Sequence, residues 1–480
     1  MDLAADLAAV VGRDAVLEDP TELVAYRSDG LASLRGTPRL AVLPATAAEV
    51  CAVVRCCAEA GVPFVARGSG TGLSGGAVPV EGGVLIVLSR MRRIHAVDLD
   101  NARVILEPGV TNAEVSRAVA AAGWFYAPDP SSGIVCSIGG NVAENSGGAH
   151  CLKYGFTTNH VTALDVVLPD GSLVELGAPA HDTVGYDLVG AFVGSEGTLG
   201  IAVRIAVRIV RRPETVVTLL AGFEGTNEAG EAVSAMVAAG ILPSAVEMMD
   251  TLALEAVEHA VHPNYPKAAA VLIVELDGVA CDVEQALAEV RAICSQHGGT
   301  SLRVAADEAE RALLWKGRKA AFAAAGRLSP GFYVQDGVVP RTALPEVLAR
   351  IAELVAQSGI RVANVFHAGD GNLHPLVLFD PAVPGEPERA GEVASEILHI
   401  CLEHGGSITG EHGVGLDKKR YLPEMFGPGD LEAMYRLRCA FDPMQRANPG
   451  KVFPTPRLCG EVPGPYREHP LERAGIAERW

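Results

Sequence analysis

Two histidines stand at the ends of the short turn in NVFHAGDGNLHPLVLF, the segment that spans residues 364–379. His367 and His374 both border apolar runs, where an imidazole ring requires a hydrogen-bond partner or a metal ion. Their spacing is not the i, i+4 spacing of a helical zinc site, so the rings can converge only if strand ends meet across the Asp370-Gly371 turn. The spacing alone leaves a structural, hydrogen-bonded pair and a metal-binding pair open.

Glu411 and His412, in the segment ITGEHGVG, are the candidates that would complete such a site. A catalytic divalent metal normally has three protein ligands and an open coordination position. Adjacent side chains on a regular strand point to opposite faces. The glycines around this pair allow a bent backbone, which would direct Glu411 toward a metal and His412 toward a substrate bound to that metal. An exposed Glu-His pair in a surface turn is the alternative.

The elements that must position these residues lie in the second half of the chain. Strand-like runs alternate there with amphipathic helices. We expect strands at 216–223, 269–276, 361–366 and 374–379, and helices near 227–240, 281–297, 343–358 and 388–404. The order strand, helix, strand, strand, helix over 332–408 predicts a ferredoxin-like α+β unit, with 216–304 as a looser second copy.

The first half of the chain also alternates strands with helices. Thr46 with Glu49, and Thr111 with Glu114, have the spacing of capping boxes, which predicts helices over 47–61 and 112–124. In the run 200–210, Ile and Val alternate with small or charged residues, as in a half-buried strand. The Arg211-Arg212-Pro213 sequence that follows predicts a domain boundary at residue 213.

Glycine-rich segments without strand or helix periodicity occupy 67–76, 127–148 and 194–200. Residues 70–75 match the dinucleotide motif G-x-G-x-x-G, and 72–76 match the nucleophile elbow, but a strand follows them where both motifs require a helix. The first segment can instead turn successive backbone N–H groups toward one anion. One such loop is equally well a plain surface loop. Three in one half favour a long, thin ligand, such as a dinucleotide, that lies against the backbone.

Composition excludes several functional classes. The formal net charge of −19 argues against nucleic-acid binding. The amino terminus has no basic segment before an apolar one, as a secretory signal would, and no apolar run approaches membrane-spanning length. The ten cysteines include no Cys-x-x-Cys pair. We therefore interpret them as reduced core thiols of a cytosolic protein, without an iron–sulfur cluster.

The longer motifs resemble a known flavoprotein family. RGSGTGLSGG, SIGGNVAENSGG, LKYG and GSEGTLGI resemble the FAD-binding half of the vanillyl-alcohol-oxidase superfamily, and FHAGDGNLHP, GGSITGEHGVG and FDPMQRANPGKVFP resemble its FAD-linked oxidase carboxy-terminal half. The resemblance is greatest to the glycolate oxidase FAD-linked subunits, among the D-2-hydroxy-acid dehydrogenases. It implies an α+β fold with a two-part FAD-binding domain over 1–213, a ferredoxin-like substrate or cap domain over 214–445, and a segment, 446–480, that returns to the flavin.

The resemblance also implies a set of FAD-binding residues. Loop 67–76 would bind the pyrophosphate, and the other segments would line the path of the adenine, ribose and flavin. The set comprises Arg67, Gly68, Ser69, Gly70, Thr71, Gly72, Leu73, Ser74, Gly75, Pro130, Ser131, Ser132, Gly139, Gly140, Asn141, Asn145, Gly147, Gly148, Gly197, Ile201, Asn448 and Lys451. Some relatives tether FAD covalently through His or Cys. Gly70 and Thr71 stand at the pyrophosphate loop here, so we expect a non-covalent flavin.

Metal and catalytic roles follow from the same resemblance. His367, His374 and Glu411 would hold a divalent metal, for which two imidazoles and a carboxylate suit zinc, manganese or iron(II). A 2-hydroxy acid would chelate this metal, His412 would take the hydroxyl proton, and the Cα hydride would pass to the flavin. Arg318 would pair with the substrate carboxylate.

Other residues near the motifs bear on geometry and substrate. Asp370 and Asn372 are candidates for orienting the metal-binding histidines. Relatives that act on D-2-hydroxyglutarate carry a Lys and an Asn where this chain has Val334 and Leu376. The resemblance therefore implies a small D-2-hydroxy monocarboxylate, glycolate or D-lactate, as the substrate. A D-lactate or D-2-hydroxyglutarate dehydrogenase of the same family is the alternative.

Two further alternatives come from other functional classes. A metallohydrolase could use the same histidines and glutamate, and a non-catalytic flavoprotein scaffold could retain them. The family resemblance implies partners as well, namely a second flavin-domain subunit and an iron–sulfur subunit. We expect a cytoplasmic protein that associates with a membrane only through such partners, and an oligomer is compatible with the sequence.

Overall fold

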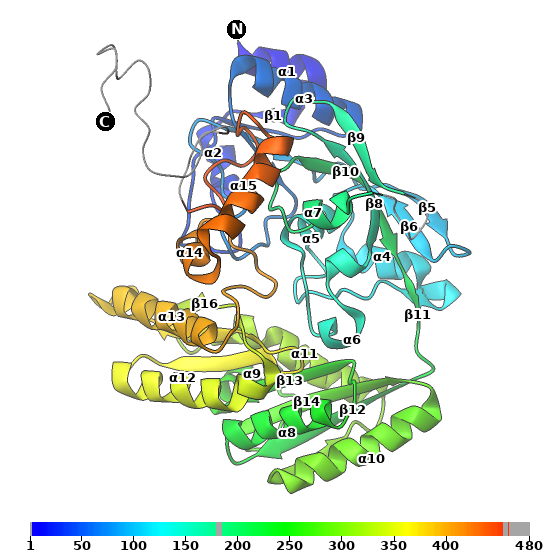
Figure 1. The fold of residues 1–480 in the computed structure, drawn as a ribbon, viewed down its shortest axis with the longest axis vertical. Coiled ribbons are helices and arrows are strands. Elements are labelled where there is room, and N and C mark those ends of the chain that lie inside the picture. The colour runs from blue at the N-terminus through cyan, green and yellow to red at the C-terminus, as the bar shows by residue number, and fades with distance from the viewer. Residues whose placement is uncertain (1, 179–184, 455–458, 460–480) are drawn as a thin grey trace.

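The computed structural model describes residues 2–178, 185–454 and 459. Figure 1 shows two layered parts: the first half of the chain forms the upper part, together with α14 (Leu422–Met425) and α15 (Pro428–Phe441), and a large sheet with its helices forms the lower part. The predicted boundary at residue 213 falls between β11 (Val210–Arg211) and β12 (Thr215–Phe223). None of the helices in the described ranges combines the length and apolarity needed to span a bilayer.

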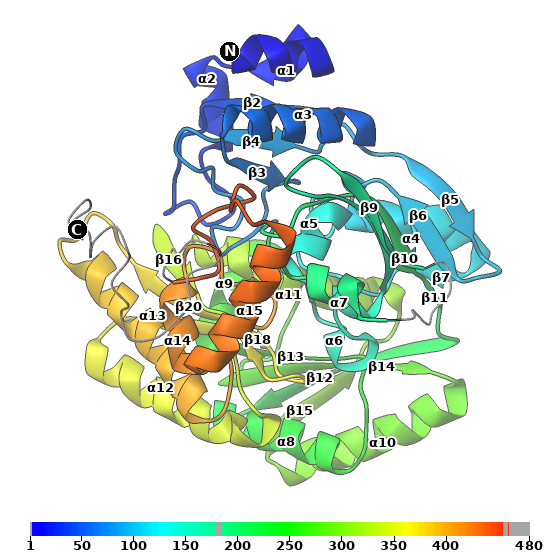
Figure 2. The ribbon, with the colours of Figure 1, turned by 45° about the horizontal axis from the view of Figure 1, so that its top comes forward.

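Two sheets organise the upper part. The first has the order β1-β2-β4-β3, formed by β1 (Val16–Leu17), β2 (Leu40–Val42), β4 (Val84–Val87) and β3 (Phe64–Arg67). In Figure 2, α1 (Leu3–Val11) lies over α3 (Ala47–Ala60), above this sheet. The second has the order β5-β6-β10-β8-β9, formed by β5 (Ile94–Asp98), β6 (Arg103–Leu106), β10 (Ile201–Arg208), β8 (Val161–Val167) and β9 (Leu173–Gly177).

The capping predictions in this half are confirmed. Thr46 Oγ1 accepts a hydrogen bond from Glu49 N at 3.2 Å, and α3 ends at Gly61 with left-handed backbone geometry. Thr111 and Glu114 form a capping box at the start of α4 (Asn112–Val119). Each cap satisfies backbone groups that a helix terminus leaves unpaired, which sets where the helix begins.

The segment 127–148 shows no helix periodicity in its sequence, yet part of it is helical. Residues 138–144 form α5 (Ile138–Glu144), and α6 (Cys151–Tyr154) follows soon after. Ser137 caps α5 by accepting a hydrogen bond from Gly140 N. A Cβ on Gly139 would lie 2.6 Å from Pro108 Cβ, so glycine allows this helix to pack closely. A helix of seven residues with two glycines is too short to show a hydrophobic period.

The lower part is built on one 9-stranded sheet with the order β15-β12-β14-β13-β18-β19-β17, and a further pair in which β16 joins β20 and β20 joins β18. Its strands after β12 are β13 (Ala245–Asp250), β14 (Ala270–Gly278), β15 (Gly299–Val304), β16 (Gly331–Val334), β17 (Gly337–Val338), β18 (Val362–His367), β19 (Asn372–Leu373) and β20 (Pro375–Phe379). Side chains alternate between two apolar clusters, one on each face of the sheet.

Helices cover both faces of this sheet. One face packs against α8 (Thr226–Ala238), α10 (Ala280–Gln296), α12 (Leu344–Ser358) and α13 (Glu386–Glu403). The other face packs against α9 (Thr251–Val261) and α11 (Glu308–Ala325), which also contact each other. Figure 1 shows α8 and α10 along the lower edge of this part.

The ferredoxin-like prediction is confirmed for both copies, but the copy over 216–304 is the more regular one and not the looser one. The strand order β15-β12-β14-β13, with α8 and α10 as connections, is that of a ferredoxin-like unit. Pairing of β13 with β18, in a register that places Glu247 opposite His367, joins this unit edge to edge with the second. The second unit is the less regular one because its edge strands break into β16 and β17, and into β19 and β20. These breaks lie at the residues that form the candidate site.

The end of the described chain returns to the first sheet. Phe64 and Ala447 form a parallel bridge, and Phe64 O accepts a hydrogen bond from Asn448 N at 2.8 Å. A disulfide joins Cys439, on α15, to Cys459 in this returning segment. The prediction that every cysteine is a reduced thiol is therefore wrong for these two residues. Their proximity depends on the path of the chain after α15, which no local cysteine motif reveals.

Candidate active site

The three predicted metal ligands converge at the break in the second ferredoxin-like unit. His367 ends β18, and His374 lies between β19 and β20. Glu411 Oε1 lies 3.4 Å from His367 Nε2 and 3.0 Å from His374 Nε2. One ligand atom from each residue lies within 4.8 Å of the other two. The strand ends therefore meet across the Asp370-Gly371 turn, as the spacing requires.

The opposite ring nitrogens are held by other groups. His367 Nδ1 lies 2.7 Å from Glu247 Oε1, and His374 Nδ1 lies 3.3 Å from the backbone oxygen of Gln335. An Nδ1–H that donates to an oxygen leaves the Nε2 lone pair free for a metal, and here both Nε2 atoms face Glu411.

Charge at the site favours a cation. Burial lowers the pKa of His367, but the carboxylates of Glu247 and Glu411 raise it well above 6.5. Burial likewise raises the pKa of Glu411, but the two histidines lower it well below 4.5. Positive charge placed between Glu247 and Glu411 therefore stabilises these two carboxylates. The donor set and its charge fit a divalent cation held by His367, His374 and Glu411.

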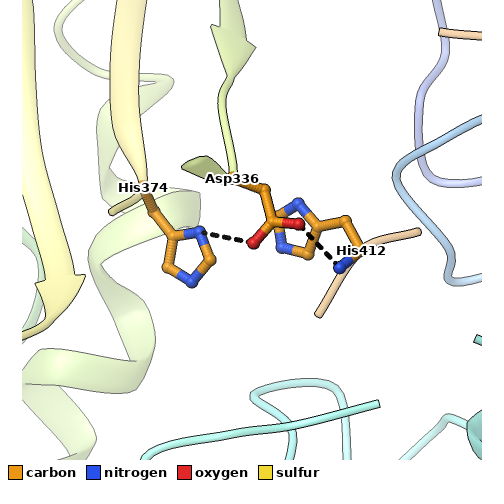
Figure 3. Close-up of side chains that lie close together, drawn as sticks. All are labelled: Asp336, His374 and His412. Atoms are coloured by element: carbon orange, nitrogen blue, oxygen red, sulfur yellow. Dashed lines mark hydrogen bonds and ion pairs between the residues drawn. The ribbon is translucent and has the colours of Figure 1, made fainter. Parts of the chain in front are cut away.

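His412 lies beside His374 and Glu411. Its ring stacks on that of His374, with centroids 4.9 Å apart and planes 11° apart. Figure 3 shows the Asp336 carboxylate in contact with the His374 ring and with the backbone nitrogen of His412. Burial lowers the pKa of His412 to about 4, although Asp336 opposes this shift. His412 Nδ1 meets no hydrogen-bond partner in the part of the chain that the structure describes. A neutral imidazole with a free nitrogen is suited to accept a proton.

A cavity of about 700 Å³ connects this site to the first glycine-rich loop. Glu411 and His412 line it, together with residues of all three glycine-rich segments and of other segments, such as 30–33 and 330–334. Of the predicted FAD residues, those that line the cavity are Arg67, Gly68, Ser69, Gly70, Thr71, Gly72, Leu73, Pro130, Ser131, Ser132, Gly139, Gly140, Asn141, Gly197 and Ile201. The glycines allow the backbone to approach a ligand closely, so these residues fit an extended dinucleotide.

The other predicted FAD residues lie behind the lining: Ser74, Gly75, Asn145, Gly147, Gly148, Asn448 and Lys451. Asn448 Nδ2 donates to the backbone oxygens of Gly76 and Glu196, at 2.9 and 2.7 Å. Lys451 Nζ donates to the oxygens of Gly76 and Val78, at 3.0 and 2.7 Å. These two buried residues hold the backbone of the glycine loop and are not among the residues that line the cavity.

Arg318 is placed differently from the sequence prediction. Its side chain is only 2% exposed, and its Nη2 lies 2.6 Å from Glu247 Oε2. Of the described residues, its neighbours Lys319 and Phe322 line the cavity, whereas Arg318 does not. The structure therefore pairs Arg318 with the carboxylate that also holds His367, and a substrate carboxylate would have to displace or join this pair.

Asp370 and Asn372 do not orient the histidine rings as expected. Asn372 Nδ2 donates to Asp336 Oδ1 at 2.8 Å, and Asp370 Oδ1 accepts from Asn372 N at 3.1 Å. Within the described ranges, neither side chain is hydrogen-bonded to His367 or His374; Glu247 and the Gln335 backbone have that role.

The two positions that were expected to influence the choice of substrate lie in different surroundings. Val334 lines the cavity, whereas Leu376, its partner across β16 and β20, is buried in the apolar cluster under α9 and α11. Sequence reasoning missed Glu247 and Asp336. A charged residue inside the apolar strand AVEMMD, and an Asp before Gly337, were the signals available.

Comparisons with known proteins agree with this geometry. Residues 38–177 match the family model for an FAD binding domain, and residues 212–452 match that for the C-terminal domain of FAD linked oxidases. Glycolate oxidase subunit GlcD of Escherichia coli strain K12 is 46% identical over 95% of this chain and 91% of its own length. The mitochondrial D-lactate dehydrogenase [cytochrome] of Arabidopsis thaliana is 33% identical over 88% of this chain and 74% of its own length.

Among solved structures, p-cresol methylhydroxylase with substrate bound superposes with a TM-score of 0.80. The match covers 94% of this chain and 96% of that chain at 19% identity, so it bears on the fold alone. The two domain matches and the two relatives bear on the family. The chain belongs to the vanillyl-alcohol-oxidase and p-cresol-methylhydroxylase family of FAD-linked oxidoreductases.

Proposed function

We propose that the protein oxidises a small D-2-hydroxy monocarboxylate, glycolate or D-lactate, to the 2-oxo acid, with non-covalent FAD and a divalent metal. The observation that carries this proposal is the cavity that runs from the glycine loops to Glu411 and His412. In this cavity, backbone that can hold a dinucleotide lies next to residues that can hold a cation and act as a base. Both therefore belong to one small-molecule site. The names of the relatives, glycolate oxidase subunit and D-lactate dehydrogenase, support the substrate class.

The chain's own residues have separable roles in this reaction. When bound, FAD accepts a hydride and a divalent cation polarises a hydroxyl oxygen. Glu411 and the two histidines would hold the cation, and the His412 ring, whose Nε2 lies 3.8 Å from Glu411 Oε1, would accept the hydroxyl proton. Glu247 keeps His367 in the tautomer that directs Nε2 toward the cation. The backbone of the glycine loops would hold the pyrophosphate and orient the cofactor without side chains in the way.

The cavity wall supports a substrate with one carboxylate. Val334 is apolar and lines the cavity near Tyr333 and Phe322, so a second carboxylate in contact with Val334 would lose water without gaining a partner. Lys319 lines the same cavity and is held 3.5 Å from Asp129, which leaves a cation close to an incoming anion. A metallohydrolase that used the same cluster would leave the glycine-lined cavity without a purpose.

A multi-subunit assembly is part of the proposal. The E. coli relative is named as a subunit, and electrons that leave the flavin need an acceptor. We propose a second flavin-domain subunit and an iron–sulfur subunit as partners, and a cytoplasmic location with any membrane association through those partners.

Anaerobic reduction of the bound flavin tests the proposed reaction. The oxidised protein is mixed with glycolate, D-lactate, L-lactate and D-2-hydroxyglutarate, before and after chelation of metal. We expect glycolate or D-lactate to bleach the flavin, L-lactate and D-2-hydroxyglutarate to act at least about tenfold more slowly, and chelation to abolish reduction. Faster reduction by D-2-hydroxyglutarate would contradict the substrate, and undiminished reduction after chelation would contradict the role of the metal.

A further inference from the structure

Glu411 and His412 lie on a segment, residues 409–417, that we call the catalytic strap. It follows α13 and passes between the cap sheet and the glycine loop of the first half. We propose that Asp336 is a positioning residue that bends this strap so that Glu411 and His412 face the same site. The proposal rests on the function proposed above, because it assigns the two strap residues to metal binding and proton transfer.

Hydrogen-bond donors at the start of the strap converge on one oxygen of the Asp336 carboxylate. Its Oδ2 accepts hydrogen bonds from Thr409 Oγ1 at 2.5 Å, Gly410 N at 3.0 Å, Glu411 N at 3.2 Å and His412 N at 2.9 Å. Asp336 is fully buried, so water does not compete for these donors. Consecutive N–H groups that converge on one anion form a concave turn and not a strand.

Two more donors complete the surroundings of this carboxylate. Lys418 Nζ lies 3.2 Å from Asp336 Oδ2, and Asn372 Nδ2 donates to Oδ1 at 2.8 Å. An ionised carboxylate offers about four lone-pair sites, and these donors occupy them.

This saturation separates Asp336 from the metal ligands. Asp336, His374 and His412 form a second group whose ligand atoms lie within 4.8 Å of one another. A cation there would have to displace Lys418 and several N–H donors from the carboxylate. Glu411 Oε1, in contrast, faces the two histidine rings. The cation therefore belongs with Glu411, and Asp336 acts through the backbone of the strap.

The bend accounts for a feature that a regular strand would forbid. Glu411 and His412 are adjacent, yet Glu411 Oε1 lies 3.0 Å from His374 Nε2 while the His412 ring stacks on the ring of His374. On a strand these two side chains would point to opposite faces. With the backbone curled around Asp336, both reach the ring of His374.

The other end of the strap is anchored to the flavin half. Glu196, which lines the cavity, accepts hydrogen bonds from Val414 N and Gly415 N, both at 2.7 Å. The backbone oxygen of Ser74, in the glycine loop, accepts from Leu416 N at 2.9 Å and Asp417 N at 3.1 Å. Two buried carboxylates thus fix the strap between the predicted metal site and the predicted flavin site.

The variant Asp336→Asn tests this role, with Asp250→Asn as the matched control. Asp250 also accepts hydrogen bonds from two backbone N–H groups, those of Ala253 and Asn364, in the cap domain, but it does not contact the strap. We expect D336N to bind Zn²⁺ or Mn²⁺ at least about tenfold more weakly in competition with a fluorescent chelator. Its anaerobic flavin reduction should slow about 100-fold, because a displacement of about 1 Å has that effect on a reacting group.

The expected pattern is selective. D336N should keep the wild-type FAD content, and D250N should keep wild-type metal affinity and reduction rate. Metal affinity in D336N equal to that of the wild type, an equal loss in D250N, or a wild-type protein that binds neither metal would overturn the proposal. Failure of the wild type to reduce its flavin with any hydroxy acid would contradict the proposed function instead, and the metal titrations of the two variants would still decide the role of Asp336.

Discussion

Glu247 is the buried carboxylate on which the predicted metal site most depends. It is held between two basic groups, with Oε1 2.7 Å from His367 Nδ1 and Oε2 2.6 Å from Arg318 Nη2. The side chains of Glu247 and Arg318 are 0% and 2% exposed, so salt and water screen this pair little. Replacing Glu247 with Ala leaves the Arg318 guanidinium buried without its counter-charge. Removal of one partner from such a pair costs about 3–5 kcal/mol of folding free energy.

Urea unfolding of metal-free protein measures this cost, since bound metal would add its own stabilisation. We expect E247A to lose about 3–5 kcal/mol, and the double variant Glu247→Leu with Arg318→Met to recover most of that loss, because paired apolar replacements are often neutral. E247A should also bind metal about 10- to 100-fold more weakly than the wild type. A loss below about 1 kcal/mol, the value of an exposed pair, or a double variant no more stable than E247A would refute the reasoning.

Three further predictions concern other contacts of the site. Burial lowers the pKa of His150, but Asp129 and Glu275 raise it from 6.5 to about 10. The stability advantage of the wild type over H150Q should therefore be complete below about pH 6.5 and disappear as the pH rises through about 10; a difference independent of pH would contradict this. A Cβ on Gly147 would lie 2.8 Å from Glu411 Oε2, so G147A should weaken metal binding about tenfold or more in chelator competition, whereas G391A, where a Cβ meets nothing within 4 Å, should not. V334K places a cation in the cavity, where a charge-assisted hydrogen bond to the distal carboxylate would be worth about 1.5–3 kcal/mol. The ratio of kcat/KM for D-2-hydroxyglutarate to that for D-lactate should therefore rise at least about tenfold. An unchanged ratio would place the distal carboxylate elsewhere.

Local features of the sequence made His367, His374 and Glu411 candidate ligands, and the family resemblance assigned them to one metal site. Glycines and a turn sequence mark where the backbone bends, and apolar runs mark the strands that carry the histidines. The strand-and-helix order of the cap domain was predictable for the same reason, since each element shows its own hydrophobic period. Loop 67–76, which lines part of the cavity, was also visible as glycine without periodicity.

The residues that hold the site in place were not predictable in this way. Glu247 lies 120 positions from His367, and Asp336 lies 75 positions from Glu411. Their contacts depend on the register in which β13 pairs with β18 and on the path of the strap around a buried carboxylate. Local sequence specifies neither this register nor this path. A shift of one residue in register turns every side chain of a strand to the opposite face of the sheet. The family resemblance assigned Arg318 to the substrate carboxylate. Its pairing with Glu247 was not predictable, because the register was unknown.

The reductive half-reaction of a His412 variant tests the central claim most directly. Oxidised wild type and His412→Asn are mixed anaerobically with glycolate or D-lactate, and bleaching of the flavin absorbance is followed. We predict that the wild type is reduced, and that H412N keeps its FAD and metal but is reduced about 100- to 10,000-fold more slowly, the usual contribution of a general base. A wild-type flavin that neither acid bleaches, or an H412N protein reduced at the wild-type rate, would contradict the proposed reaction at this site.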